Sequence, residues 1–104
     1  MTNASGLLDA LAEPTRRSIL ERLATEPSAV SDIAREMPIS RSAVSQHLQI
    51  LKSVGLVTDH AEGTRRIYQV DPAALAVIRS YFDAFWRRSL ASFQDAARRP
   101  EGKP

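Results

Sequence analysis

The stretch ISRSAVSQHLQILKSVGLV, residues 39–57, decides the fold of this chain. Within it, Val44 and Leu48 belong to an apolar stripe with the spacing of one helical face. Ser40 is a favourable N-cap for that helix, and Gly55 is well placed to end it. The other side of the helix carries arginine, serine and glutamine but no acid. A negatively charged partner that offers hydrogen-bonding edges would suit such a face.

A short helix is predicted directly before this stretch. Its sequence, VSDIAREM, places Ser31 as the expected cap and Ile33 among the apolar residues, and Pro38 closes it. Two helices joined by the tripeptide PIS form a helix-turn-helix, for which we predict the bounds 31–55. In DNA-binding examples of this motif, the second helix lies in the major groove.

The segment after the second helix is predicted to be a β-hairpin over residues 56–70. Short runs of β-branched and aromatic residues flank Gly63, which lets the chain turn tightly. Thr64, Arg65 and Arg66 lie at or just after the tip. Two arginines on a protruding ribbon, or wing, would reach backbone phosphates or a narrow minor groove. The alternative is that they only keep an edge strand soluble.

A long helix is predicted over residues 72–97, opened by Asp71 as N-cap and Pro72 at the first position. It contains five of the six aromatic residues. Its apolar residues cover an arc of about 180°, whereas packing on one core needs roughly 100°. The surplus predicts pairing with a second copy of the chain beside a short N-terminal helix, and a wider intramolecular core is the alternative. The residues predicted for this dimer interface are Leu7, Leu8, Leu11, Ile78, Tyr81, Phe82, Phe85, Trp86, Ser89 and Phe93.

The polar face of the second helix fits the chemistry of the DNA major groove. There, arginine donates two hydrogen bonds to guanine, glutamine bonds adenine in bidentate fashion, and serine serves either role. A plain solvated face is the alternative. His47 is expected to be half-buried at the base of the helix and to bond backbone or phosphate rather than a metal. The residues predicted to bind double-stranded DNA are Ser40, Arg41, Ser42, Ser45, Gln46, His47, Gln49, Lys52, Thr64, Arg65 and Arg66.

The length and composition are those of one small globular domain, predicted to span residues 1–104. The predicted fold class is mainly α with a small β-hairpin (α+β): a winged helix-turn-helix of about five helices and a two-stranded wing. The formal net charge is only +2. The N-terminal part of the chain is acidic, and the central and C-terminal parts are basic. The chain has no cysteine and shows no signal peptide or membrane span, so we expect a cytoplasmic protein that does not contact a membrane.

Four segments, LAEPTRRSILERLA, VSDIA, SRSAVSQHLQILKSVGLV and EGTRRIYQVD, follow in order and spacing the pattern of ArsR-type winged-helix repressors. The chain resembles this family over most of its length. The resemblance implies a homodimer that binds an operator palindrome and represses transcription, including that of its own gene. It also implies that the protein releases DNA when an effector binds. The segment YFDAFWRRSLASF is similar to the last helix of a subset without a metal-binding motif.

The resemblance also locates the metal sites of other family members. Alignment with members that use a Cys-x-Cys pair places those positions at Ala29 and Ser31, so this thiolate site is absent. Other members build a zinc site from Asp and His on the final helix. Residues 72–104 contain no histidine, and Asp71 and Asp83 alone make a poor zinc site. We therefore expect neither a metal nor a cofactor.

Catalysis is not expected, because the chain lacks cysteine, a nucleophile motif and a glycine-rich phosphate loop, and has only two histidines. Two alternatives stay open. One is a metal- or small-molecule-responsive sensor of the same fold with an unrecognised effector site. The other is a dimeric interaction module that has lost DNA binding. Its expected signature is acids on the polar helix face or a wing without arginine, and the sequence shows neither.

Overall fold

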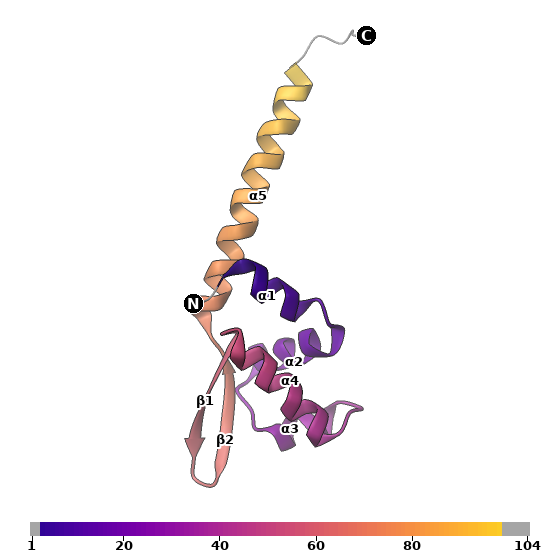
Figure 1. The fold of residues 1–104 in the computed structure, drawn as a ribbon, viewed down its shortest axis with the longest axis vertical. Coiled ribbons are helices and arrows are strands. Elements are labelled where there is room, and N and C mark those ends of the chain that lie inside the picture. The colour runs from indigo at the N-terminus through magenta and orange to yellow at the C-terminus, as the bar shows by residue number, and fades with distance from the viewer. Residues whose placement is uncertain (1–2, 99–104) are drawn as a thin grey trace.

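The computed structural model describes residues 3–98. Its elements are α1 (Ala4–Leu11), α2 (Pro14–Thr25), α3 (Val30–Glu36), α4 (Arg41–Ser53), β1 (Val57–Glu62), β2 (Arg65–Val70) and α5 (Pro72–Arg98). Five helices and a two-stranded antiparallel hairpin in these residues confirm the predicted fold class. The hairpin and α5 project in opposite directions from the body that α1 to α4 form (Figure 1).

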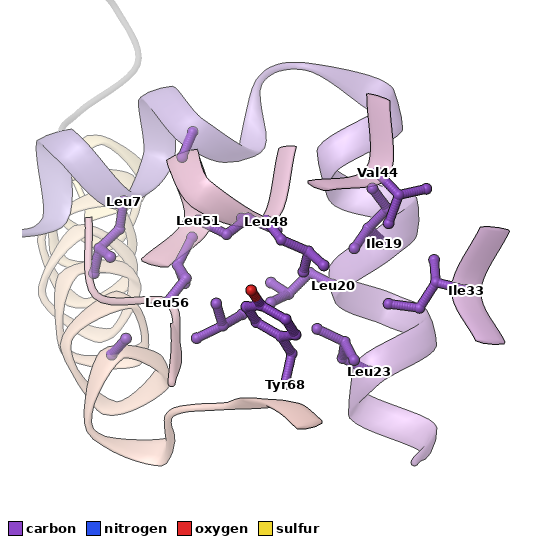
Figure 2. Packing of buried hydrophobic residues seen from close by; sticks show 13 residues of the cluster. Leu7, Ile19, Leu20, Leu23, Ile33, Val44, Leu48, Leu51, Leu56 and Tyr68 are labelled. Atoms are coloured by element: carbon purple, nitrogen blue, oxygen red, sulfur yellow. The ribbon is translucent and has the colours of Figure 1, made fainter. Parts of the chain in front are cut away.

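The hydrophobic core lies between the first four helices and the base of the hairpin (Figure 2). Leu48, Leu51 and Leu56 are fully buried there, and Tyr68 joins them from β2. Full burial of one such leucine contributes about 1.5–3 kcal/mol. α4 packs against both α2 and α3. The core therefore holds α4 in one orientation and decides which of its faces meets solvent.

Most helix ends follow the expected local chemistry. The Ser40 hydroxyl accepts a hydrogen bond from the Ala43 N–H (3.1 Å), which confirms Ser40 as the N-cap of α4. Asp71 Oδ1 accepts a hydrogen bond from the Ala73 N–H (2.9 Å) at the start of α5. Gly55 follows the end of α4 with a φ of 90°, in the left-handed region where glycine is favoured.

The start of α3 differs from the prediction. This helix begins at Val30, so Ser31 lies inside it, and the prediction that Ser31 is the cap is wrong. Ala29 occupies the N-cap position, and its N–H donates a hydrogen bond to the Asp32 carboxylate (3.4 Å). A carboxylate in the first helical turn suits the unpaired amides and the positive end of the helix dipole.

The wing is formed by β1 and β2 in antiparallel pairing. Its two-residue turn consists of Gly63, with a φ of 65°, and the exposed Thr64. At its base, Tyr68 exchanges two backbone hydrogen bonds with Ser28 (3.0 and 2.9 Å). The wing is therefore anchored to the segment that leads into α3, while its tip stays in solvent.

α5 leaves the core after its first turns. Ala74 is buried, and Val77 and Ile78 are partly buried where α5 meets α1. Further along α5, no residue up to Arg98 is buried. Among the described helices, none is both long enough and apolar enough to cross a membrane.

Leu7 has a different position from the one predicted. Its side chain is completely buried (0% exposed) in the core of its own chain, in the same cluster as Leu51 and Leu56 (Figure 2). A side chain without exposed surface is not available to a second copy, so the prediction that Leu7 lies at the dimer interface is wrong. Leu8 and Leu11, from the same helix, are half-buried and keep exposed surface.

Candidate nucleic-acid interface

The outer face of α4 presents polar side chains with no acid among them. Arg41, Ser42, Gln46 and Gln49 are exposed, and Ser45 is half-buried. Within residues 3–98, none of these five side chains has a hydrogen-bond or ion-pair partner. Their donors and acceptors are the ones that read base edges in the major groove, and all of them are free to bond an external ligand.

The inner side of α4 keeps this face in place. Val44, Leu48 and Leu51 are each fully buried, so any rotation of the helix would expose three large apolar side chains. Ser40 is exposed at the N-terminus of α4, where its hydroxyl oxygen accepts the N-cap hydrogen bond. Its hydroxyl proton remains available to a ligand, because a hydroxyl group both donates and accepts.

Both wing arginines are held by carboxylates. Arg65 donates a short hydrogen bond to Asp32 of α3, and the Arg66 guanidinium lies 3.4 Å from the Asp59 carboxylate of β1. Asp32 also accepts a hydrogen bond from Arg35 (2.6 Å). This hydrogen bond, more than the others, lowers the pKa of Asp32, although partial burial opposes the shift. Both wing arginines remain about half exposed, so they are positioned but still open to solvent.

Lys52 lies on the wing side of α4 and is already paired. Its ammonium lies 3.0 Å from the Asp59 carboxylate, whose side chain is only 8% exposed. The hydrogen bond from Lys52 lowers the pKa of Asp59, and the positive charges of Lys52 and Arg66 add to this effect against burial. Lys52 thus joins α4 to β1. The Lys52 side chain is still 46% exposed, and its contact with DNA stays a prediction.

His47 faces α2 rather than the outer side of α4. Its Nδ1 lies 4.0 Å from Glu13 Oε1, and its side chain is 22% exposed, which agrees with the half-buried position expected. Glu13 is the N-cap of α2 and accepts a hydrogen bond from the Arg16 N–H (2.8 Å). Among the described residues, His47 Nδ1 is buried without a hydrogen-bond partner. The contact of His47 with DNA stays a prediction.

A second surface, here named the aromatic face, runs along α5. Its large exposed side chains are Leu75, Tyr81, Phe82, Phe85, Trp86, Leu90 and Phe93. Trp86 and Phe93 are 64% and 69% exposed, whereas Ile78 is partly buried in its own core and Ser89 is exposed. Leu75 and Leu90 are additions to the predicted set. Large apolar patches are uncommon on soluble monomers and mark interaction sites.

The chain is similar to proteins whose family is known. Residues 11–60 match the family model described as a helix-turn-helix domain. The chain is 55% identical over 84 residues to the HTH-type transcriptional regulator Rv2034 of Mycobacterium tuberculosis. The aligned segment covers 81% of this chain and 78% of that protein. Its fold matches an ArsR-like transcriptional regulator from Rhodococcus sp. RHA1, with a TM-score of 0.74, 30% identity, and 90% and 92% of the two chains covered. The chain belongs to the ArsR/SmtB family of transcriptional regulators.

Two further proteins extend this similarity. The transcriptional repressor SdpR of Bacillus subtilis is 34% identical over 71 residues, which cover 68% of this chain and 79% of that protein. A crystal structure of a possible transcriptional regulator for arsenical resistance matches with a TM-score of 0.71 and 42% identity, over 84% of this chain and 95% of that one. These relatives regulate transcription, so the chain is a DNA-binding transcriptional regulator and not an enzyme, as predicted.

The positions that the family resemblance assigns to a cysteine pair hold Ala29, which is buried, and Ser31, which is half-buried. In the part of the chain that the structure describes, no group of three or more His, Cys, Asp and Glu side chains is placed to hold a metal ion. Metal independence stays a prediction, and a zinc titration tests it.

Proposed function

We propose that this ArsR/SmtB regulator is a homodimeric repressor that binds an inverted-repeat operator, including one at its own promoter. The observation that carries the proposal is the outer face of α4, where Gln46 and Gln49 are exposed, free of acidic neighbours on that face, and without partners in residues 3–98. Glutamine bonds adenine in bidentate fashion, and serine bonds several base edges. We assign base reading to these glutamines together with Ser42 and Ser45.

The wing supplies contacts that do not depend on sequence. We assign Arg65 and Arg66 to backbone phosphates or to the minor groove beside the α4 site, since carboxylates position both side chains without burying them. Each phosphate contact releases condensed counterions, so affinity for DNA should fall steeply as salt rises. A regulator that works this way acts where the chromosome is, and we therefore place it in the cytoplasm.

Dimerisation would cover the aromatic face. Exposure of seven large apolar side chains on one helix to water is unfavourable. Pairing of α5 with its symmetry mate would bury these side chains between the two helices. Phe85 and Trp86 are the expected anchors, with Leu8 and Leu11 at the edge, because large aromatic side chains dominate interface energetics. A two-fold axis then relates two α4 helices, and the half-site centres are expected about one helical turn, roughly 34 Å, apart.

A gel shift with the promoter fragment upstream of its own gene tests the proposal. We expect a saturable shift that an excess of unrelated duplex does not remove and that Gln46→Ala weakens. Gln94→Ala is the matched control, because it removes an exposed glutamine from α5 and should leave the shift unchanged. A shift that unrelated duplex removes as readily as the promoter fragment would contradict specific recognition.

A further inference from the structure

A cavity of about 230 Å³ opens between the start of α3, the start of α4 and the wing. The residues that bring charge or an aliphatic hydroxyl group to its lining are Ser31, Arg41, Thr64, Arg65 and Arg66. Three of these five are arginines, and they come from two elements that are far apart in the sequence. Like charges repel one another, so three arginines in the lining of one cavity favour an anion beside them.

The carboxylates beside the cavity compensate only part of this charge. Asp32 is shared between Arg65 and a second arginine of α3, and Asp59 is shared between Arg66 and a lysine of α4. Arg41 has no ion-pair partner in the described part of the chain. Glu62 lies opposite Arg65 in the hairpin and adds a third carboxylate, so five cationic groups meet three carboxylates and two positive charges remain in excess.

The position of Arg41 on α4 directs it to the wing. Arg41 and Lys52 are eleven residues apart, which places them within about 20° of each other around the helix. Lys52 reaches the wing through its ion pair with Asp59. Arg41 therefore lies on the same flank, at the edge of the outer face and away from its centre, which agrees with its place in the cavity lining.

The size and chemistry of the cavity define its ligand. It is smaller than pockets of roughly 300–1,000 Å³ that hold drug-sized molecules, and much larger than the share of about 30 Å³ that one water takes. Guanidinium groups bind phosphate in bidentate fashion, and hydroxyl groups such as those of Ser31 and Thr64 donate further hydrogen bonds to its oxygens. A small anion of the phosphate type fits both the volume and the donors.

We propose that this cavity is an oxyanion-binding site for a phosphate group, which a backbone phosphate of bound DNA or a free phosphate compound occupies in competition. Arg41 is then a phosphate contact rather than the guanine contact expected from the sequence. The DNA part of this inference rests on the proposed function, whereas binding of a free anion does not. A phosphate compound in the cell that fills the cavity would oppose DNA binding directly.

The free-anion part is tested by titrating inorganic pyrophosphate into the full chain at constant ionic strength, by calorimetry and by NMR of the arginine side chains. We expect saturable binding of one pyrophosphate per chain, and a loss of affinity of at least about tenfold in Arg41→Ala and Arg66→Ala. Arg41→Lys should fall between them and the wild type, because lysine keeps the charge but not the bidentate geometry. Circular dichroism establishes that each variant is folded.

Arg87→Ala is the matched control for this titration. Arg87 is exposed on α5, and its removal changes the net charge by the same amount without touching the cavity. Its affinity for pyrophosphate should equal that of the wild type. Binding that does not saturate, or a loss in Arg87→Ala as large as in Arg41→Ala, would show attraction by net charge alone and overturn the site.

The DNA part is tested with operator duplexes in which single phosphates are replaced by neutral methylphosphonates. We expect one position in each half-site at which the replacement weakens the wild type at least about tenfold but leaves Arg41→Ala almost unchanged. Pyrophosphate should also displace the wild type from the operator more readily than it displaces Arg41→Ala. Specific operator binding without any phosphate coupled to Arg41 overturns this part while the proposed function stands. If no duplex is bound specifically, the proposed function fails and the pyrophosphate titration alone decides the site.

Discussion

The Lys52 ammonium lies 3.0 Å from the carboxylate of Asp59, and this ion pair ties the last turn of α4 to the first strand of the wing. The same carboxylate lies 3.4 Å from the guanidinium of Arg66. One nearly buried acid therefore sets the angle between the helix and the wing arginine. In the proposed function both must meet one DNA duplex, so this joint fixes the geometry of recognition.

The joint should weaken in acid. The pKa of Asp59 in the folded chain lies below its ordinary value of 3.8, chiefly because Lys52 donates a hydrogen bond to it. A lowered pKa favours the folded state at every pH above the ordinary value, and this contribution disappears as the pH falls below it towards the lowered pKa. We expect the thermal midpoint, followed by circular dichroism, to fall more steeply below about pH 4 in the wild type than in Asp59→Asn.

A double-mutant cycle checks the cause of that pH dependence. Once Asp59→Asn is present, Lys52→Met should add little to the loss of stability, because the pair is already broken. The difference between wild type and Asp59→Asn should also shrink at about 1 M salt, since Lys52 is partly exposed and salt screens the pair. Parallel pH profiles for wild type and Asp59→Asn would contradict this role of the pair.

Substitutions on α4 and on the wing should change DNA binding in different ways. Gln46→Ala should relax the preference at particular base pairs, at a cost of about 1–3 kcal/mol for the preferred base. Arg65→Ala should weaken all sequences alike and reduce the salt dependence by about one phosphate contact. Competition assays with a library of operator variants at two salt concentrations separate the two effects. If Gln46→Ala lowered the affinity for all sequences equally, Gln46 would not be a residue that reads bases.

The aromatic face should control assembly. Phe85→Glu and Trp86→Glu each place a charge among exposed aromatic side chains of α5, so both variants should sediment as monomers, stay at least partly helical, and lose tight operator binding. Ser80→Glu is the matched control, because Ser80 is exposed on the polar side of the same helix and should leave the dimer intact. A wild-type monomer at micromolar concentration, or unaltered dimers for both aromatic variants, would contradict the proposed interface.

Operator binding should not respond to zinc, cadmium, arsenite or chelators. The chain has no cysteine, and Ala29 and Ser31 occupy the positions at which the resemblance expects thiolates. Calorimetry with zinc should show no site tighter than about micromolar. A tight stoichiometric site that changes DNA affinity would contradict this prediction and direct attention to His47 and His60.

The elements of the fold were predictable because local chemistry determines their ends. Ser40 caps α4, Gly55 and Gly63 take left-handed backbone angles, and Asp71 accepts the amide of Ala73, each within three residues of its partner or by its own backbone. Such signals survive in any fold that contains the helix or turn. The predicted α3 cap was wrong because the helix begins one residue before Ser31, and Asp32 in its first turn accepts the hydrogen bond that the N–H of Ala29 donates.

The ion pairs that position the site were not predictable to the same extent. Asp59 and Arg66 are diagonal neighbours across the hairpin, so the register implied by the turn at Gly63 was enough to pair them. Asp32 and Arg65 are 33 residues apart, and no local pattern joins them. The apolar stripe of α1 likewise predicted that its leucines are buried. It did not indicate whether they pack against the same chain or against a second copy.

Selection of genomic fragments bound by the purified protein, followed by sequencing, tests the central claim most directly. Recognition by two α4 helices related by a two-fold axis predicts that the bound fragments share one inverted repeat with half-site centres about 10 base pairs, roughly 34 Å, apart. The same selection with Gln46→Ala should return a repeat with relaxed preference at defined positions in each half. Bound fragments that share no inverted repeat would contradict sequence-specific recognition by a dimer.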